Sequence, residues 1–229
     1  MKKIILTLLA TSYLLVAQTL PNAITTTITN INNNGEIQLA NSVPKGRSGI
    51  IIHNYGNNLS AITHATISNG STASVLPYQA ILHENIPNVK TNVAVGDKVI
   101  FGNFYENALL IAPNQEVYKH ITQTYKKTWI HPDRFALNLM KDDERSLTLE
   151  NIKKFAQLNQ IGLVLIVVPN RVVILDPISK KFLGAFAMQT NRKNAMSPFY
   201  ARFEQMDTST FGFSKKDYPP YYQVVSGLK

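Results

Sequence analysis

The side chains best suited to binding a metal or moving a proton are the five histidines, His53, His64, His83, His120 and His131. None of them stands in an HxxxH or HExxH pair, the spacings that bring two imidazoles to one metal on a helix. His53 and His64 lie on adjacent expected strands and could approach each other, but no carboxylate or thiol stands beside either one in the sequence. We therefore predict no metal site and no cofactor.

Motifs for nucleophilic or phosphate chemistry are also missing from the sequence. It has no cysteine, which excludes zinc–thiolate sites, cysteine nucleophiles and the lipidated cysteine of a lipoprotein anchor. It contains no GxSxG, P-loop or GxGxxG pattern. The acidic run Asp142-Asp143-Glu144 lacks the alternate spacing and the glycine of a calcium loop. We predict a protein that binds without catalysing a reaction, and we assign no catalytic residue.

Aromatic and basic side chains crowd the segment after residue 190. Aromatic residues and arginine are enriched at the centres of protein interfaces, which makes this segment a candidate interface. The same side chains could instead wrap the segment back onto the domain core, and the sequence leaves both alternatives open. The interface candidates are Tyr200, Arg202, Phe211, Phe213, Lys215, Lys216, Tyr221 and Tyr222.

The first 17 residues have the organisation of a secretory signal peptide. Lys2 and Lys3 form a positive end, and an uncharged, mostly apolar run follows from residue 4 to residue 17. Cleavage is expected after Ala17 or as late as Ala23. The apolar run is shorter than the roughly 20 residues that a membrane-spanning helix needs. We therefore expect an exported protein that is not integral to a membrane after cleavage.

Positive charge is concentrated in the second half of the chain. From Lys119 onward there are 17 of the 23 lysines and arginines and 9 of the 14 acidic residues, which accounts for +8 of the net charge of +9. For an exported protein the acidic partners are membrane head groups, anionic polysaccharide or another protein, and nucleic acid is not expected. A solvated positive surface is the alternative. The oligomeric state is not indicated.

Residues 24–104 predict a small all-β barrel or sandwich. Short runs rich in β-branched residues are separated by turns of asparagine and glycine, such as residues 32–35, 56–58 and 69–70. Several short strands at this close spacing are typical of these two architectures.

Residues 105–190 predict a mixed α/β domain with a short central sheet, which makes the whole chain α+β. Asn114 and Thr148 are suitable N-caps for two of its helices, and the fully apolar run 163–168 is typical of a buried central strand. Residues 191–229 are expected to form a partly ordered extension. The elements expected in the domain cover residues 108–112, 114–125, 129–131, 133–140 (or 132–140), 149–159, 163–168, 172–175 and 182–188.

Four segments carry a resemblance to a known family. They are NALLIAPN at 107–114 with the helix that follows it, FAQLNQIGLV at 155–164, VILD at 173–176, and the turn Gly96-Asp97. Together they resemble the N-terminal domain family of the plasminogen-binding proteins PgbA and PgbB, over most of the chain after the signal.

The resemblance implies a non-enzymatic envelope or surface protein of a Gram-negative bacterium that binds host plasminogen through lysine. The kringle modules of plasminogen recognise a lysine ammonium together with a free carboxylate, and a C-terminal lysine presents both. Lys229, the last residue, is the ligand-binding residue that the resemblance implies, with Gly227 keeping the end mobile. The family's proteins continue in a long charged extension where this sequence stops.

A second hypothesis comes from the order of a capped helix, an apolar strand and a hairpin. This order resembles the small α/β domains of envelope assembly proteins, a likeness of fold that does not by itself fix function. On this hypothesis the protein is a periplasmic scaffold or assembly factor of an outer-membrane or flagellar-motor complex. Lysine-competable binding at the cell surface would favour the first hypothesis, and co-purification with envelope machinery would favour the second.

Overall fold

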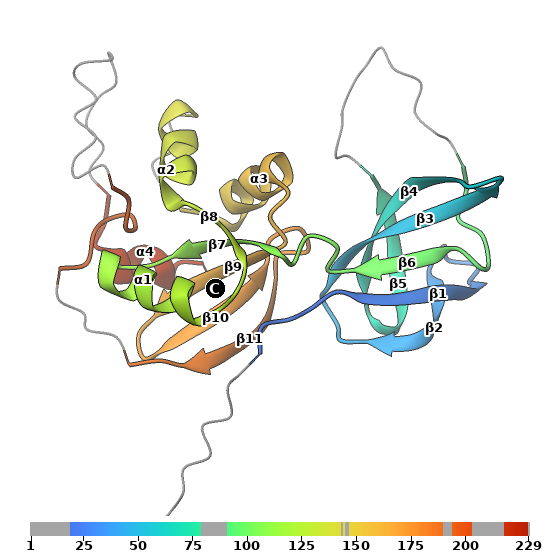
Figure 1. Ribbon diagram of the computed structural model, residues 1–229, viewed down its shortest axis with the longest axis horizontal. Helices are drawn as coiled ribbons and strands as arrows, with labels where there is room; N and C mark the ends of the chain where they lie inside the picture. Colours follow the sequence, from blue (N-terminus) through green and yellow to red (C-terminus); the bar gives the residue numbers. More distant parts are fainter. Residues whose placement is uncertain are drawn as a thin grey trace, which may run out of the picture.

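The structure is a computed structural model that describes residues 19–78, 91–142, 144, 147–189, 194–202 and 218–228. A β-barrel built from the first part of the chain is followed by a five-stranded sheet with its helices (Figure 1). The expected α+β class is confirmed, and of the two all-β alternatives the structure has the barrel. Residues 1–17, the expected signal peptide, lie outside the described residues. Among the helices that are described, none has the length and apolar character needed to cross a membrane.

The barrel closes in the strand order β1-β2-β5-β4-β3-β6, with every pair antiparallel. Alternate side chains point inward, as in β1, where Thr26 and Ile28 are buried and their neighbours are not. The interior is filled mainly by branched aliphatic side chains and Phe101. The strands are β1 (Ile24–Ile31), β2 (Ile37–Val43), β3 (Ser48–Gly56), β4 (Leu59–Ser68), β5 (Gly70–Pro77) and β6 (Lys98–Phe101).

The second sheet has the order β11-β10-β9-β7-β8, in which β7 runs parallel to β8 and β9 while β10 runs antiparallel to β9 and β11. The central strand β9 is buried along its whole length, in agreement with its apolar sequence. The strands are β7 (Asn107–Ile111), β8 (Thr128–Ile130), β9 (Leu163–Val168), β10 (Arg171–Asp176) and β11 (Lys181–Ala187).

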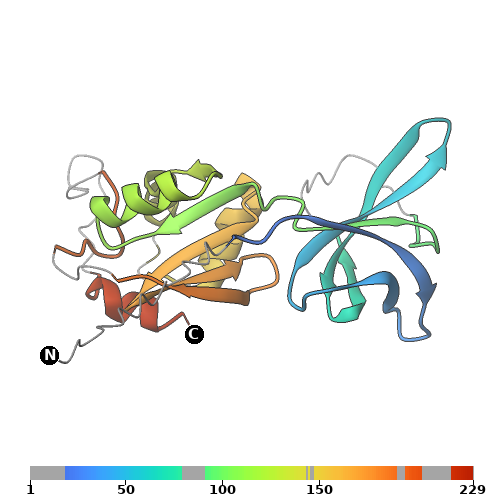
Figure 2. The same cartoon turned by 60° about the horizontal axis from the view of Figure 1, so that its bottom comes forward.

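Helices pack on both faces of this sheet. α1 (Gln115–Thr124) lies on one face, and α2 (Pro132–Lys141), α3 (Leu149–Asn159) and the short α4 (Tyr221–Ser226) contribute to the core on the other face. Figure 2 shows α1 and α4 on opposite sides of the sheet. The predicted caps are present: the Asn114 side chain accepts a hydrogen bond from the Val117 amide at 3.0 Å, and Thr148 accepts one from Asn151 at 3.1 Å.

The end of the chain differs from the expected partly ordered extension, because its described residues belong to the core. Phe199, Tyr221, Val225 and Leu228 are all buried among the side chains of the α2–α3 face. The segment is also tied to the end of β7, since the Tyr200 amide donates to the carbonyl of Ala112 at 2.8 Å. Weak periodicity concealed this role, because the segment packs as single side chains and one helix of six residues.

Candidate functional site

The carboxyl ends of the parallel strands are where open α/β sheets usually hold a ligand. Here this place is filled by the chain's own C-terminal segment. The Tyr221 hydroxyl lies 2.7 Å from the carbonyl oxygen of Val167 at the end of β9 and 3.0 Å from that of Ile111 at the end of β7. Its side chain is 1% exposed, and burial raises its pKa well above 10. The hydroxyl therefore stays protonated and acts as a hydrogen-bond donor. The usual ligand position is therefore part of the core.

A second polar cluster lies at the N-terminus of α2. The buried carboxylate of Asp133 accepts hydrogen bonds from the backbone amide of Arg202 at 2.8 Å and from its Nε at 2.6 Å. Burial alone would raise the pKa of Asp133, but these hydrogen bonds and the charge of Arg202 outweigh it and lower the pKa. Arg202, a predicted interface residue, thus clamps the C-terminal segment to α2 while its side chain remains largely exposed.

His131 caps α2 and completes this cluster. Its Nδ1 accepts a hydrogen bond from the amide of Asp133 at 3.2 Å, a role that the sequence analysis did not anticipate for a histidine. Burial lowers the pKa of His131, and the nearby Asp133 carboxylate only partly offsets that effect. The ring also stands 5.2 Å from that of Tyr118 and 6.2 Å from that of Tyr200. The neutral imidazole is therefore built into the structure as a cap.

Among the carboxylates that the structure describes, Asp176 accepts the most hydrogen bonds, and it lies at the joint between the barrel and the sheet. It is fully buried. Its Oδ2 accepts hydrogen bonds at 2.8 Å from the Ser48 amide, the Ser48 hydroxyl and the Tyr105 hydroxyl. Its Oδ1 accepts two more, at 3.0 Å, from the amides of Ile178 and Ser179. With five donors engaged, this carboxylate is an architectural group that joins strands far apart in the sequence.

The Ser–Tyr–Asp composition of this joint does not make it a reactive site. Burial, the Asp176 charge and the hydrogen bond to Asp176 raise the pKa of Tyr105 far above its ordinary value, so the phenol remains a donor. The Ser48 hydroxyl donates to a carboxylate, and no histidine or lysine takes part in the described bonds of Asp176. The sequence analysis named Asp176 only within the VILD segment of the family resemblance and gave it no partner.

The histidines of the barrel do not form the pair that was considered. His53 contacts Asp97 instead, with 2.7 Å between Nδ1 and Oδ1, and the other oxygen of Asp97 accepts from the Ala94 amide at 2.8 Å. This carboxylate lies 44 residues away in the sequence, which explains why the sequence alone gave His53 no partner. No group of three histidine, aspartate or glutamate side chains in the described part of the chain could hold a metal ion.

Half of the predicted interface residues can be placed. Tyr200 and Tyr221 are buried, so these two side chains follow the alternative in which the segment packs onto the core. Tyr222 is partly buried against the same core, and Arg202 forms the clamp to Asp133. The residues that fall outside the described part of the chain are Phe211, Phe213, Lys215, Lys216 and the predicted ligand-binding residue Lys229.

Gly227 was expected to keep the C-terminal end mobile, and the structure contradicts this for the residues up to 228. The Gly227 amide donates to the carbonyl of Val224 at 3.2 Å, and the Leu228 amide donates to that of Val225 at 3.3 Å. Leu228 itself is 3% exposed. The chain is therefore anchored to the core one residue before Lys229.

The surface also offers a cleft between the barrel and α3, with a volume of about 250 Å³. Its lining combines apolar residues with the polar side chains of Asn103, Gln157, Gln160 and Lys153. Ser48 and Ile178, whose amides donate to Asp176, are among the residues that line this cleft.

Comparison with known proteins identifies one family. The model of the family described as "Plasminogen-binding protein pgbA N-terminal" matches residues 23–225, which include both the barrel and the sheet. Plasminogen-binding protein PgbA from each of two Helicobacter pylori strains is 29% identical to this chain over 174 residues, covering 72% of it. The match covers only 38% of those relatives' own length. No solved structure matches the chain significantly.

Proposed function

The chain belongs to the family of the N-terminal region of plasminogen-binding protein PgbA, and on that premise we propose that it is a non-enzymatic binding protein of the cell envelope or surface, with plasminogen as its protein partner. The observation that carries the proposal is the extent of the family match, from residue 23 to residue 225. Both relatives are named for plasminogen binding, and the match covers 38% of their length.

The arrangement of the polar side chains supports binding rather than catalysis. The buried carboxylates of Asp133 and Asp176 are engaged by internal donors. The Tyr221 hydroxyl occupies the place where an open α/β sheet would hold a substrate. These groups stabilise the fold and are not poised to act as an acid, a base or a nucleophile.

We place the contact with plasminogen at Lys229. The kringle modules recognise an ammonium and a carboxylate together, a C-terminal lysine would present both, and the proposal assigns this role to Lys229. Leu228 is anchored in the core immediately before it, so little of the backbone would have to be ordered when a kringle binds. Export to the envelope or the surface of a Gram-negative cell is part of the same proposal.

The test measures binding of the purified protein, residues 24–229, to immobilised plasminogen. The intact protein is compared with a variant that lacks Lys229, and each is measured with and without excess free lysine. Lys119→Gln is the matched control, because it removes one exposed positive charge from α1 while leaving the C-terminus intact.

Saturable binding that is lost on deletion of Lys229 and in free lysine, but kept in Lys119→Gln, is the expected result. Binding that survives both the deletion and the competition would refute the terminal-lysine mode and leave plasminogen as the partner. The absence of any binding would refute the proposed function for this chain, and the scaffold hypothesis would then be tested by co-purification from envelope extracts.

A further inference from the structure

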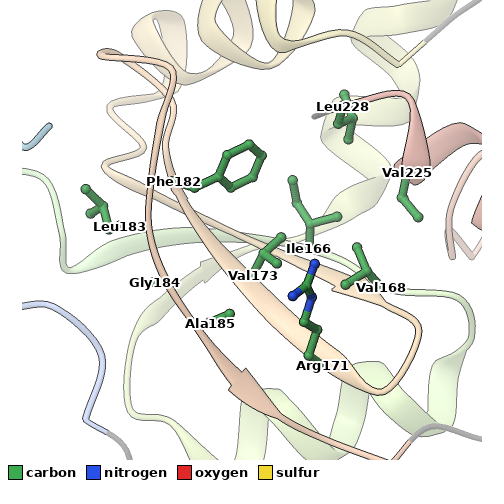
Figure 3. Close-up of a pocket in the computed structure, with 10 residues that line it drawn as sticks. All are labelled: Ile166, Val168, Arg171, Val173, Phe182, Leu183, Gly184, Ala185, Val225 and Leu228. Carbon is green, nitrogen blue, oxygen red and sulfur yellow. The ribbon is translucent and has the colours of Figure 1, made fainter.

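An apolar groove with a volume of about 550 Å³ lies on the α4 side of the second sheet. Its floor is formed by Ile166 and Val168 of β9 and Val173 of β10, and Val225 and Leu228 form the wall on the side of α4 (Figure 3). This volume is within the range of roughly 300–1,000 Å³ that is typical of small-molecule sites.

The groove exists because this face of the sheet is only partly covered by helices. Val225 and Leu228 pack into the same core as Ile166 and Val168, whereas Phe182 on the edge strand β11 remains 42% exposed. The opposite face of β11 is covered, because the ring of Phe186 lies 5.3 Å from that of Tyr125. Phe182 therefore presents an apolar side chain to solvent beside the groove.

Arg171 is the only charged residue among the described residues that line this groove. Among the residues that the structure describes, no carboxylate forms an ion pair with its guanidinium. Figure 3 shows the Arg171 side chain directed into the same space as Val173 and Val168. An unpaired guanidinium beside apolar side chains is complementary to a ligand that has one anionic group and an apolar body.

We propose that the groove binds one molecule of a long-chain carboxylic acid, with its acyl chain along the apolar floor and its carboxylate paired with Arg171. A peptide lying on the floor of the groove fits less well than an acyl chain, because its amide groups would find no free backbone partners on that floor. The backbone groups of β10 are already paired with β9 and β11 on either side. An unbranched acyl chain needs no partner except at its head.

The proposal predicts how affinity depends on chain length. Saturated acids of 8, 10, 12 and 14 carbons are titrated into the delipidated protein by calorimetry, below their micelle concentrations. Each added methylene that enters the groove should raise the affinity about fourfold, until the groove is filled. Anionic phospholipid vesicles are a separate arm. Binding to vesicles without binding of monomeric acid would overturn the proposal in favour of membrane attachment.

Two variants test the geometry. Arg171→Gln should weaken binding of dodecanoic acid by about tenfold or more, which is the scale of a charge-assisted hydrogen bond, and should leave dodecanol binding unchanged. Lys119→Gln, which removes a positive charge from α1, should not change either affinity. Ala185 is exposed and pairs with Val173 across the strands, so both side chains point to the groove. Ala185→Phe should therefore fill the groove and abolish binding of both ligands.

An affinity that does not depend on chain length would overturn the proposal, and so would equal effects of Arg171→Gln and Lys119→Gln. The remaining alternative is that a second copy of this chain occupies the groove, and sedimentation velocity tests it. If the protein is a dimer that Ala185→Phe converts to a monomer, and the acids do not bind, the groove is an interface between copies and the proposal is wrong. None of these measurements involves plasminogen, so the two proposals can fail independently.

Discussion

Replacing Asp176 with asparagine should uncouple the barrel from the second sheet. The carboxylate accepts three hydrogen bonds on Oδ2, from Ser48 and Tyr105, and two on Oδ1, from the amides of Ile178 and Ser179. An asparagine side chain has the same shape but only one acceptor oxygen. With the NH₂ on the Oδ1 side, the partly buried amides of Ile178 and Ser179 lose their acceptor. With the NH₂ on the Oδ2 side, the buried Ser48 amide loses its acceptor and both hydroxyls have to accept instead of donate.

The size of the effect follows from the donors that lose their acceptor. A buried donor without a partner costs about 1–3 kcal/mol, so Asp176→Asn should lower the free energy of unfolding by at least about 1–3 kcal/mol. This is a large share of the roughly 5–15 kcal/mol that stabilises a typical domain. Because the lost bonds join the two parts of the chain, the loss should also reduce the cooperativity of unfolding.

Urea unfolding can measure both quantities with two signals. The protein has a single tryptophan, Trp129 in β8, so its fluorescence reports on the second sheet, whereas far-UV circular dichroism reports on both parts. The two transitions should coincide in the native protein and separate in Asp176→Asn. Glu116→Gln, which removes an exposed carboxylate from the first turn of α1, is the control and should leave the curves together. A shift of less than about 1 kcal/mol in Asp176→Asn, with coincident transitions, would refute the role assigned to this carboxylate.

Three further predictions concern local structure. Burial lowers the pKa of His131 below its ordinary value of 6.5, so the native state loses stability as pH falls through 6.5. His131→Asn keeps a capping side chain and should reduce the change in the urea midpoint between pH 5 and 7. The same change at His120 should not reduce it. Asn114→Ala should cost about 1 kcal/mol of unfolding free energy through loss of the α1 cap, and an unchanged midpoint would contradict that role. Gly162→Ala should sharply lower the melting temperature, because a Cβ there would stand 2.4 Å from a backbone carbon, whereas Gly184→Ala meets no atom within 4 Å and serves as the control.

Much of the fold could be predicted from the sequence because the signals that set it are local. Alternating β-branched residues and asparagine–glycine turns indicated the strands of the barrel, and the apolar run 163–168 indicated the buried central strand β9. The caps at Asn114 and Thr148 were identified by residue type alone, because each contacts an amide only three residues away. The choice between barrel and sandwich was left to the structure, since it depends on whether β6 pairs with both β1 and β3.

The residues of the candidate sites were harder to predict, because their partners lie far apart in the sequence. Asp176 forms hydrogen bonds with Ser48, which lies 128 residues away in the sequence, and His53 contacts Asp97, which lies 44 residues away. The groove beside Arg171 needs β9, β10, β11 and the anchored end of the chain to come together. No periodicity or short motif in the sequence predicts contacts between residues so far apart.

The sequence by itself thus determined the class of the fold, the positions of most helices and strands, and the resemblance to a family of binding proteins. The tertiary structure alone decided that Tyr221 and Phe199 belong to the core, that Asp176 joins the two parts, and that one sheet face stays open beside Arg171. The physical reason is that secondary structure follows from neighbouring residues. The burial and pairing of a polar or aromatic side chain depend instead on which distant surfaces the completed fold brings against it.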